Sequence, residues 1–159
     1  MNRRHGVSTE RERGFTLLIA MTITATLLLV SAGIISVAVR EAFLTSSARE
    51  SQYAFYAADT ATECAVYWDV KNPAGYSAFA TSTASSIYCN KDSSNPSNQF
   101  TVGSSAVSNF TMTFLPKPYC ASVTVNKMAN GHVTIDSHGY NTCDQSNPRR
   151  VERAVRVTY

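Results

Sequence analysis

The hydrophobic pattern of the chain is dominated by one long apolar run near the N-terminus. Residues 15–39 are 25 consecutive uncharged positions, bounded by Arg13 and Arg40. As a helix this run measures about 37 Å, which is enough to cross a bilayer core of about 30 Å. Serine and threonine interrupt the run, but hydroxyl groups that bond to the preceding helical turn keep their cost in lipid moderate. We therefore expect residues 15–39 to form a transmembrane helix.

The pattern after the apolar run still predicts helix. Residues 40–69 contain neither glycine nor proline, and Asn72-Pro73 then ends the pattern. Small side chains and one large aromatic recur at three- and four-residue spacing: Ala54, Ala58, Ala61, Ala65 and Trp68. That spacing places a small-residue stripe on one helix face. The sequence predicts a single helix over residues 15–69, apolar all round in its first half and amphipathic in its second.

Alternating apolar and polar residues predict strands in the remainder, residues 70–159. The segments with this alternation are 110–114, 121–125, 133–135 and 154–159. Asn130-Gly131 is a hairpin signal, and residues 139–141 are expected to form a further turn. The four strands predict an antiparallel meander whose apolar face covers the small-residue stripe, which is an α+β head.

The segment between the helix and the first predicted strand has a different composition. Residues 77–98 are dominated by serine, threonine, alanine and asparagine, which is typical of a surface loop. Cys89 lies within it, and Cys64 on the helix is its nearest cysteine toward the N-terminus. A Cys64–Cys89 disulfide would close a loop of about 25 residues and contribute about 3 kcal/mol.

The cysteine usage points to an oxidising compartment. The chain has four cysteines, and none lies in a C-x-x-C pair. Cys120 opens one predicted strand and Cys143 follows its hairpin partner, so a Cys120–Cys143 bond would close the distal loop. Four cysteines allow three connectivities, and the pairing stays open at this point.

Charge is distributed unevenly along the chain. Residues 1–14 carry four arginines against two glutamates, whereas residues 15–159 carry ten basic and nine acidic side chains. The basic excess before an apolar run keeps residues 1–14 in the cytoplasm by the positive-inside rule. The near-neutral remainder gives no general attraction to nucleic acid. Two simple interpretations of the apolar run stay open at this point. It could be a secretory signal peptide with a cleavage site near Gly33, or a plain N-terminal membrane anchor.

The N-terminal region resembles the type IV prepilin family. The likeness rests on the short basic leader, on Arg13-Gly14-Phe15-Thr16-Leu17-Leu18 and on the long apolar helix, while residues 49–61 are similar to the corresponding region of PilX-type minor pilins. The resemblance implies that prepilin peptidase cuts after Gly14 and that Phe15 becomes the N-methylated first residue. Glycine suits such a site because its bare backbone can lie close in a protease cleft. It also implies a pilin-like head, in which a disulfide such as Cys120–Cys143 is common.

One departure from the family pattern narrows the expected role. Most major pilins have glutamate at the fifth residue after the cut, and this chain has Ile19. The resemblance then implies a minor, priming or tip subunit of a type IV pilus or a type II secretion pseudopilus, with residues 15 and 17–19 (Phe15, Leu17, Leu18 and Ile19) packed in the filament core. Its partners would be other pilin subunits, prepilin peptidase, the inner-membrane assembly platform and membrane lipid. Before assembly it would be a single-pass inner-membrane protein, and afterwards part of an extracellular pilus or periplasmic pseudopilus.

Candidate chemistry elsewhere is sparse. No hydrolase, phosphate-loop or zinc-protease motif occurs, so we expect neither an enzyme nor a cofactor. A zinc set of Cys120, His132, His138 and Cys143 fits no compact finger, and we expect no metal. The C-terminal arginines are Arg149, Arg150, Arg153 and Arg156. They are interpreted as a solvated strand edge or as a DNA-backbone patch, which leaves a pilus-displayed DNA-binding or adhesive module as one alternative. A non-filament membrane-anchored periplasmic protein is the other.

Overall fold

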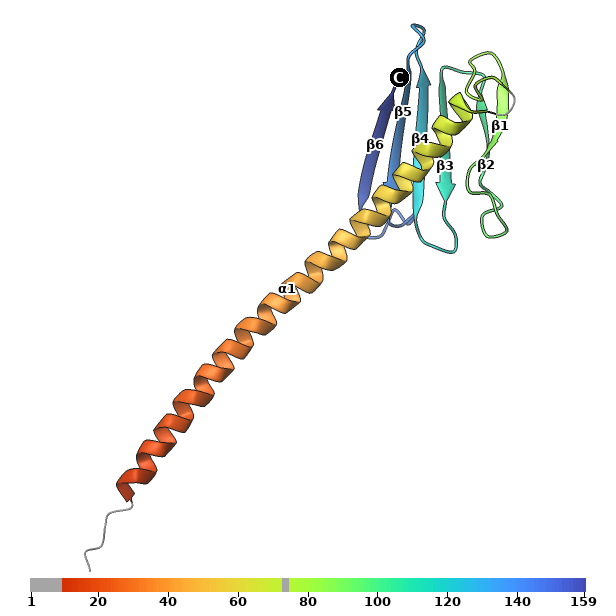
Figure 1. Ribbon diagram of the computed structural model, residues 1–159. Coiled ribbons are helices and arrows are strands. Elements are labelled where there is room, and N and C mark those ends of the chain that lie inside the picture. The colour runs from red at the N-terminus through yellow and green to blue at the C-terminus, as the bar shows by residue number, and fades with distance from the viewer. Residues whose placement is uncertain (1–9, 73–74) are drawn as a thin grey trace, which may run out of the picture. The chain divides into compact units, whose positions relative to one another are not determined.

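The computed structural model describes residues 10–72 and 75–159, with residues 10–13 described by their backbone alone. One long helix, α1 (Glu10–Val70), is followed by six strands (Figure 1): β1 (Ala84–Tyr88), β2 (Gln99–Gly103), β3 (Val107–Thr113), β4 (Cys120–Lys127), β5 (Val133–Tyr140) and β6 (Glu152–Thr158). The chain divides into two compact units, Met1–Ser46 and Ser47–Tyr159. The predicted helix and the α+β layout are confirmed.

The larger sheet is the predicted meander. Its strand order is β3-β4-β5-β6, and every neighbouring pair is antiparallel. The β4–β5 turn contains the predicted Asn130-Gly131, with Gly131 at a φ of +87° that glycine adopts without steric cost. Within this unit, the C-terminal part of α1 lies across one face of the sheet (Figure 1).

Strand β5 is longer than the sequence predicts. The expected turn at residues 139–141 is wrong at its first two positions, because Gly139 and Tyr140 pair with Arg153 and Glu152 of β6. Gly139 is a strand residue, and it is glycine because the helix lies against it. A β-carbon built there would be 2.0 Å from the carbonyl oxygen of Ala54. The glycine marks a close backbone approach instead of a bend.

The core lies between the small-residue stripe of α1 and the inner face of the sheet. Ala54, Ala58, Ala61 and Ala65 are fully buried, as the spacing predicted. The sheet presents apolar side chains to them at alternate positions, including Met112, Ala121, Val123, Val125 and Ile135. The hydroxyl of Ser137 donates a hydrogen bond of 2.8 Å to the Ala58 carbonyl oxygen, so the one polar group of β5 that is fully buried on this face has a partner.

The interpretation of residues 77–98 as a surface loop is wrong in part. Strand β1 lies within it and pairs with β2 in a separate two-stranded antiparallel sheet. Phe79 and Ile87 are buried, and the Phe79 ring stacks on Phe110 of β3 with centroids 6.4 Å apart. The weak apolar pattern of β1 is sufficient because the strand buries only one side chain, that of Ile87.

Two buried asparagines complete the packing of this segment. The Asn98 side chain accepts a hydrogen bond from the Thr113 backbone nitrogen (3.0 Å) and donates to the Thr113 carbonyl (2.7 Å). Asn95 does the same for the backbone nitrogen and carbonyl of Leu115, at 2.7 and 2.9 Å. Each side-chain amide therefore supplies the hydrogen bonds that the backbone of a neighbouring strand would make at the end of β3. For this reason the two polar side chains are buried without an unsatisfied group.

The predicted Cys64–Cys89 disulfide is present. It joins α1 to the residue after β1, with a Cα–Cα distance of 5.9 Å. Beside it, the Trp68 indole nitrogen donates to the Tyr88 carbonyl oxygen at 3.1 Å. The disulfide and this hydrogen bond fasten the two-stranded sheet to the helix.

Candidate functional site

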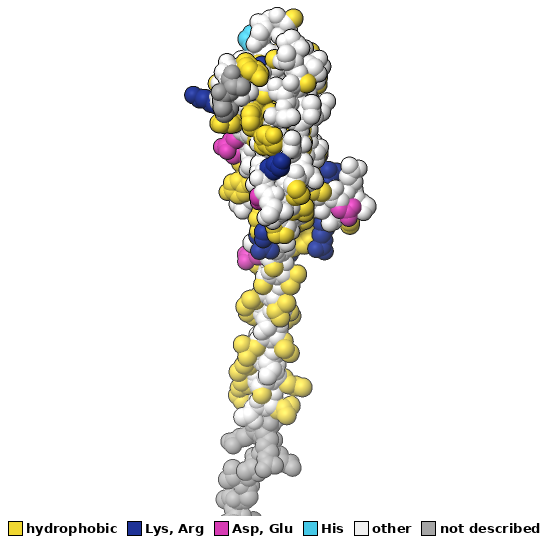
Figure 2. Space-filling model, turned by 90° about the vertical axis from the view of Figure 1, so that its right-hand side faces the viewer, with side chains coloured by type: hydrophobic (Ala, Val, Ile, Leu, Met, Phe, Trp, Pro, Cys, Tyr) yellow, Lys and Arg dark blue, Asp and Glu magenta, His cyan; other side chains and the backbone are white. Residues whose placement is uncertain are grey.

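The most distinctive surface is the N-terminal part of α1. From residue 14 to residue 44 every side chain is exposed, and most are large and apolar. Figure 2 shows hydrophobic side chains along this stretch on the face in view. Within the described residues, α1 is long and apolar enough to cross a membrane. That supports a single-pass anchor at the level of length and composition.

The hydroxyl groups in this stretch are satisfied within the helix. Thr22, Thr24, Thr26, Ser31 and Ser36 each donate to a carbonyl three or four residues earlier, at 2.8–3.0 Å. No water is needed for these bonds. The polar interruptions that the sequence shows are therefore compatible with a lipid environment.

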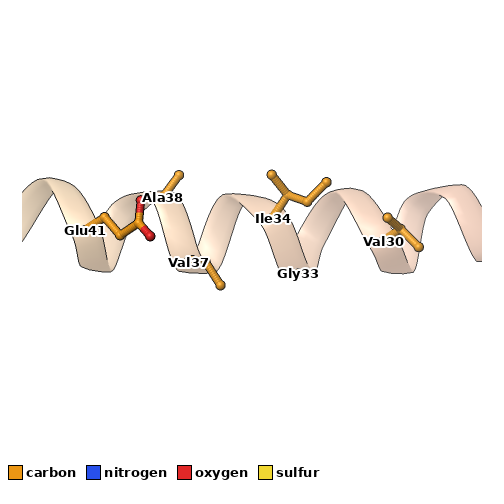
Figure 3. A pocket seen from close by; sticks show the side chains of 6 residues that line it. All are labelled: Val30, Gly33, Ile34, Val37, Ala38 and Glu41. Carbon is orange, nitrogen blue, oxygen red and sulfur yellow. The ribbon is translucent and has the colours of Figure 1, made fainter.

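A shallow groove runs along one face of this stretch. Figure 3 shows the residues that line it: Val30, Gly33, Ile34, Val37, Ala38 and Glu41. Gly33 has no heavy atom within 4 Å of an added β-carbon, so the groove is open to solvent or lipid there. Glu41 is the one ionisable side chain among the six.

The predicted processing site lies near the start of α1. Gly14 and Phe15 are both exposed, and the space around Gly14 is open. Leu17, Leu18 and Ile19 follow on successive faces with 63%, 59% and 39% of their surface exposed. Residues 1–9 of the predicted leader lie outside the described residues. Because Gly14 is helical, cleavage after it would require the first turns of α1 to unwind, and glycine lowers the cost of that by about 0.5–1 kcal/mol relative to alanine.

Near the C-terminal end of α1, the Asp69 carboxylate contacts three other side chains. Its carboxylate lies 2.6 Å from the Lys127 ammonium group and accepts a 2.7 Å hydrogen bond from the Tyr159 hydroxyl. Ser77 donates a further, short hydrogen bond to it. The cluster joins the helix end to β4, to the C-terminal residue and to the segment after the helix. Only 4% of the Asp69 side chain is exposed.

The charges of this cluster shift two pKa values. Burial acts to raise the pKa of Asp69, but the bonds from Lys127, Ser77 and Tyr159 outweigh it, so the pKa lies below its usual 3.8. Burial raises the pKa of Tyr159, and so do its hydrogen bond to Asp69 and the carboxylate charge. Asp69 is therefore ionised and Tyr159 is a neutral donor at any physiological pH.

A second set of polar contacts holds α1 near its entry into the Ser47–Tyr159 unit. The Asn141 side-chain nitrogen donates to Glu50 and to the Arg149 carbonyl, both at 3.0 Å. Arg153 donates from its Nε to the Ser51 hydroxyl at 2.8 Å. These bonds fix the segment before β6 and the start of β6 to the same turn of the helix.

The predicted Cys120–Cys143 disulfide is not formed in the structure. Both residues are free thiols, Cys120 buried and Cys143 exposed. They lie together in a pocket of about 210 Å³. The Cys143 backbone nitrogen donates to the Pro118 carbonyl at 2.9 Å, which places the residue beside the start of β4. The order of the strands was enough to predict that the two cysteines lie close together.

The environment of Cys120 makes its thiol unreactive. Burial raises the pKa of Cys120 to about 12, and the neighbouring Cys143 acts in the same direction against a small opposing effect of Arg150. Because the thiolate is the reactive species, Cys120 is inert at neutral pH. Of the two thiols, Cys143 is the exposed one.

The two histidines of the candidate zinc set, His132 and His138, have other surroundings. His138 contacts Glu152 across the β5–β6 pair, with Nδ1 2.5 Å from Oε1, while His132 lies in the β4–β5 turn. In the described part of the chain, no three His, Cys, Asp or Glu side chains gather as a metal ion would require.

The four C-terminal arginines are separated by the fold. Arg156 forms an ion pair with Asp136 on the outer face of the sheet, and Arg153 points to the helix side. The Arg150 guanidinium lies 3.7 Å from the centre of the Tyr140 ring and donates to the Thr142 carbonyl. Arg149 is exposed in the turn before β6. Three of the four guanidinium groups contact other groups of the protein, and of these Arg156 is paired with a carboxylate.

Sequence reasoning missed an aromatic groove on the head. Tyr53 of α1 stacks on Tyr119 with centroids 4.7 Å apart, and both line a space of about 250 Å³ together with Tyr56, Ala57, Thr60 and Phe114. Burial raises the pKa of Tyr119, with smaller effects in the same direction from Tyr53 and Glu50. The tyrosines at helix positions 53 and 56 are visible in the sequence. The aromatic residues that they face, Phe114 and Tyr119, come from the connection between β3 and β4, far along the chain.

Comparison with known proteins gives no match: neither a protein-family model, nor a curated protein, nor a solved structure is similar to this chain.

Proposed function

We propose that this chain is a minor subunit of a type IV pilus or type II secretion pseudopilus. Its first helical half would anchor it in the inner membrane and later pack in the filament core, while the head is displayed outside. Prepilin peptidase would remove residues 1–14, and the assembly platform would draw the mature chain from the lipid into the filament.

A single observation carries the proposal. The exposed apolar stretch and the part of the helix that packs against the sheet belong to one helix, because α1 continues from Glu10 to Val70. Within the Ser47–Tyr159 unit, the helix is attached to the strands by the Cys64–Cys89 disulfide, the Gly139 contact and the Asp69 cluster. A plain anchor can connect to its head by a flexible linker. In a filament subunit, the packing of the helix in the core sets where the head is displayed. This requires a helix without a break.

The DNA-binding alternative has weaker support, because Arg156 is paired with Asp136 on the outer face of the sheet while Arg153 contacts Ser51 on the helix side. No described site favours an enzyme. The filament role is therefore the function that the helix and the head support best.

Fractionation of cells tests the proposal. The chain should be found in sheared filaments or in cross-linked periplasmic assemblies as well as in the inner membrane. Gly14→Leu should block processing and hold the chain in the membrane, because a bulky side chain prevents the close backbone approach that a peptidase needs. Ser31→Ala, which removes one hydroxyl from the same helix, should leave processing unchanged. Normal processing and assembly of Gly14→Leu would contradict the proposal.

A further inference from the structure

Strand β6 is one edge of the four-stranded sheet, and only β5 pairs with it (Figure 1). Val133 and Tyr159 exchange two backbone hydrogen bonds, of 2.8 and 3.1 Å, so they form a hydrogen-bonded pair of this ladder. In an antiparallel ladder such pairs alternate with pairs whose backbone groups point away from the neighbouring strand. By the β5–β6 register, the residues whose amide and carbonyl groups point to the free edge are Glu152, Ala154, Arg156 and Thr158. Within the described residues one of these groups is bonded, the Glu152 carbonyl, which accepts a 3.0 Å bond from the Arg153 side chain.

The usual protections of an edge strand are missing from β6. It pairs with β5 over seven consecutive residues without a bulge, and it contains no proline. Its two arginines are turned to other parts of the unit, because Arg156 is paired with Asp136 of β5 and Arg153 donates to α1. The opposite edge, β3, differs, since the Asn98 side chain bonds to the backbone nitrogen and carbonyl of Thr113. The free edge of β6 is therefore a template for a further strand.

The side chains along this edge define which kind of segment fits it. On the helix side of β6, Val155 and Val157 are half-buried, so apolar residues of an added strand would extend the core there. Arg153 lies on the same side and forms no ion pair with a carboxylate of the described chain. The nearest acidic residue of the strand, Glu152, is already paired with His138 on the outer face. A fitting segment presents two apolar side chains and one carboxylate on a single face.

We propose that the free edge of β6 binds an extended segment of a different protein, which adds a fifth strand to the sheet. The inference rests on the proposed function in that this protein belongs to the same filament or assembly complex. Its segment places apolar residues opposite Val155 and Val157 and a carboxylate opposite Arg153. Backbone hydrogen bonds supply affinity, and the alternate side chains supply selectivity. The β6 strand of a second copy does not fit, because the charged side chain on its helix side is again Arg153.

Hydrogen exchange at single-residue resolution tests the added strand in the unaltered chain. In the detergent-solubilised chain, the amides of Ala154 and Arg156 should exchange much faster than those of Val155 and Val157, since only the latter bond to β5. In the purified filament or cross-linked assembly, the amides of Ala154 and Arg156 should slow by about tenfold or more. If these two amides stay fast in an assembly that contains the processed chain, the inference is wrong.

Removal of one outward donor provides a second test. Ala154→Pro deletes an amide that points to the free edge and leaves the bonds to β5 in place, since proline is tolerated where the nitrogen faces outward from an edge strand. Ala154→Val keeps the donor and is the matched control. The assembled fraction of Ala154→Pro should fall about fivefold, by the size of one hydrogen bond, while Ala154→Val assembles like the unaltered chain. Thermal melting by circular dichroism shows whether both variants are folded. A folded Ala154→Pro chain that assembles normally would overturn the added strand, and if this variant does not fold, the exchange experiment decides.

Charge reversal tests the chemistry of the bound segment. Arg153→Glu should lower the assembled fraction about two- to fivefold, by the size of a cross-strand charge pair, whereas Arg153→Lys should not. Equal assembly of the two variants would refute the carboxylate opposite Arg153. Processing after Gly14 is scored on the same samples. A processed and assembled chain whose edge amides stay fast refutes this inference alone, while absent processing of the unaltered chain refutes the proposed function.

Discussion

The backbone of Gly139 faces Ala58 so closely that a β-carbon on the glycine would lie 2.4 Å from the Ala58 nitrogen. Strand β5 and helix α1 thus meet with no side chain between them at this point. Small residues on both elements make the approach possible, and the Ser137 bond to the Ala58 carbonyl uses it.

Gly139→Ala should destabilise the Ser47–Tyr159 unit by about 2–3 kcal/mol, because the added methyl group meets rigid backbone atoms and forces the helix away from the sheet. Chemical denaturation of the detergent-solubilised chain, followed by circular dichroism, measures the change. Ser122→Thr adds a methyl group on the opposite face of the sheet and should change stability by much less. Equal effects of the two variants would show that the close approach is not a constraint.

The Asp69 cluster predicts a defined pH dependence. Asp69→Asn should cost about 2–3 kcal/mol at neutral pH, because it leaves Lys127 half-buried without its counter-ion. The pKa of Asp69 is lower in the folded chain than its ordinary 3.8, so its contribution is fully present above that value and is lost as the pH falls through the folded pKa. The stability difference between Asp69→Asn and the unaltered chain should thus be constant from pH 5 to 8, at about the value above, and shrink only below about pH 4.

Asp136→Asn is the matched control for that experiment, since it removes an equally close ion pair, to Arg156, from the exposed face of the sheet. Exposed pairs contribute little, so its effect should be much smaller and should weaken with added salt. A larger loss from Asp136→Asn than from Asp69→Asn would contradict the account of the cluster.

The four cysteines should differ in reactivity. Alkylation of the folded, unreduced chain should modify Cys143 quickly and Cys120 only after unfolding, because Cys120 is buried and burial raises its pKa to about 12. Cys64 and Cys89 should not react until they are reduced. Peptide mass mapping gives the extent at each residue. Complete protection of Cys143 would show that it is bonded and not free.

Removal of the disulfide should loosen the two-stranded sheet. The double variant Cys64→Ala/Cys89→Ala frees a loop of 25 residues and should lose about 3 kcal/mol in free energy of unfolding. Hydrogen exchange should increase most in β1 and β2, which depend on this bond for their attachment to α1. An unchanged exchange rate there would mean that the Phe79–Phe110 contact is sufficient by itself.

Much of the fold could be predicted because its signals are local. The alanine spacing gave the buried face of α1, and Asn130-Gly131 with the alternating segments gave the meander. The β1–β2 sheet could not be found this way, since Ile87 is the one fully buried side chain of β1 and the residues before it in the strand are alanine and serines. The same applies to Asn95 and Asn98, whose burial depends on backbone groups at the end of β3.

In the candidate site, too, the features with a local sequence signal could be predicted and those that depend on distant contacts could not. Hydropathy located the exposed helix, and sequence proximity gave Cys64–Cys89. The arginines were adjacent in sequence, but strand alternation and separate partners send Arg153 and Arg156 to opposite faces of the sheet. Gly139 was interpreted as a turn because glycine alone does not distinguish a bend from a close approach.

The most direct test of the filament proposal is the mass of the mature N-terminus in chain extracted from membranes. The account predicts that the mature chain begins at Phe15 and is heavier by one methyl group, with Gly14 as the last residue of the removed leader. A chain that keeps Met1, or one that begins near Gly33, would contradict processing as a prepilin and with it the proposed role in a filament.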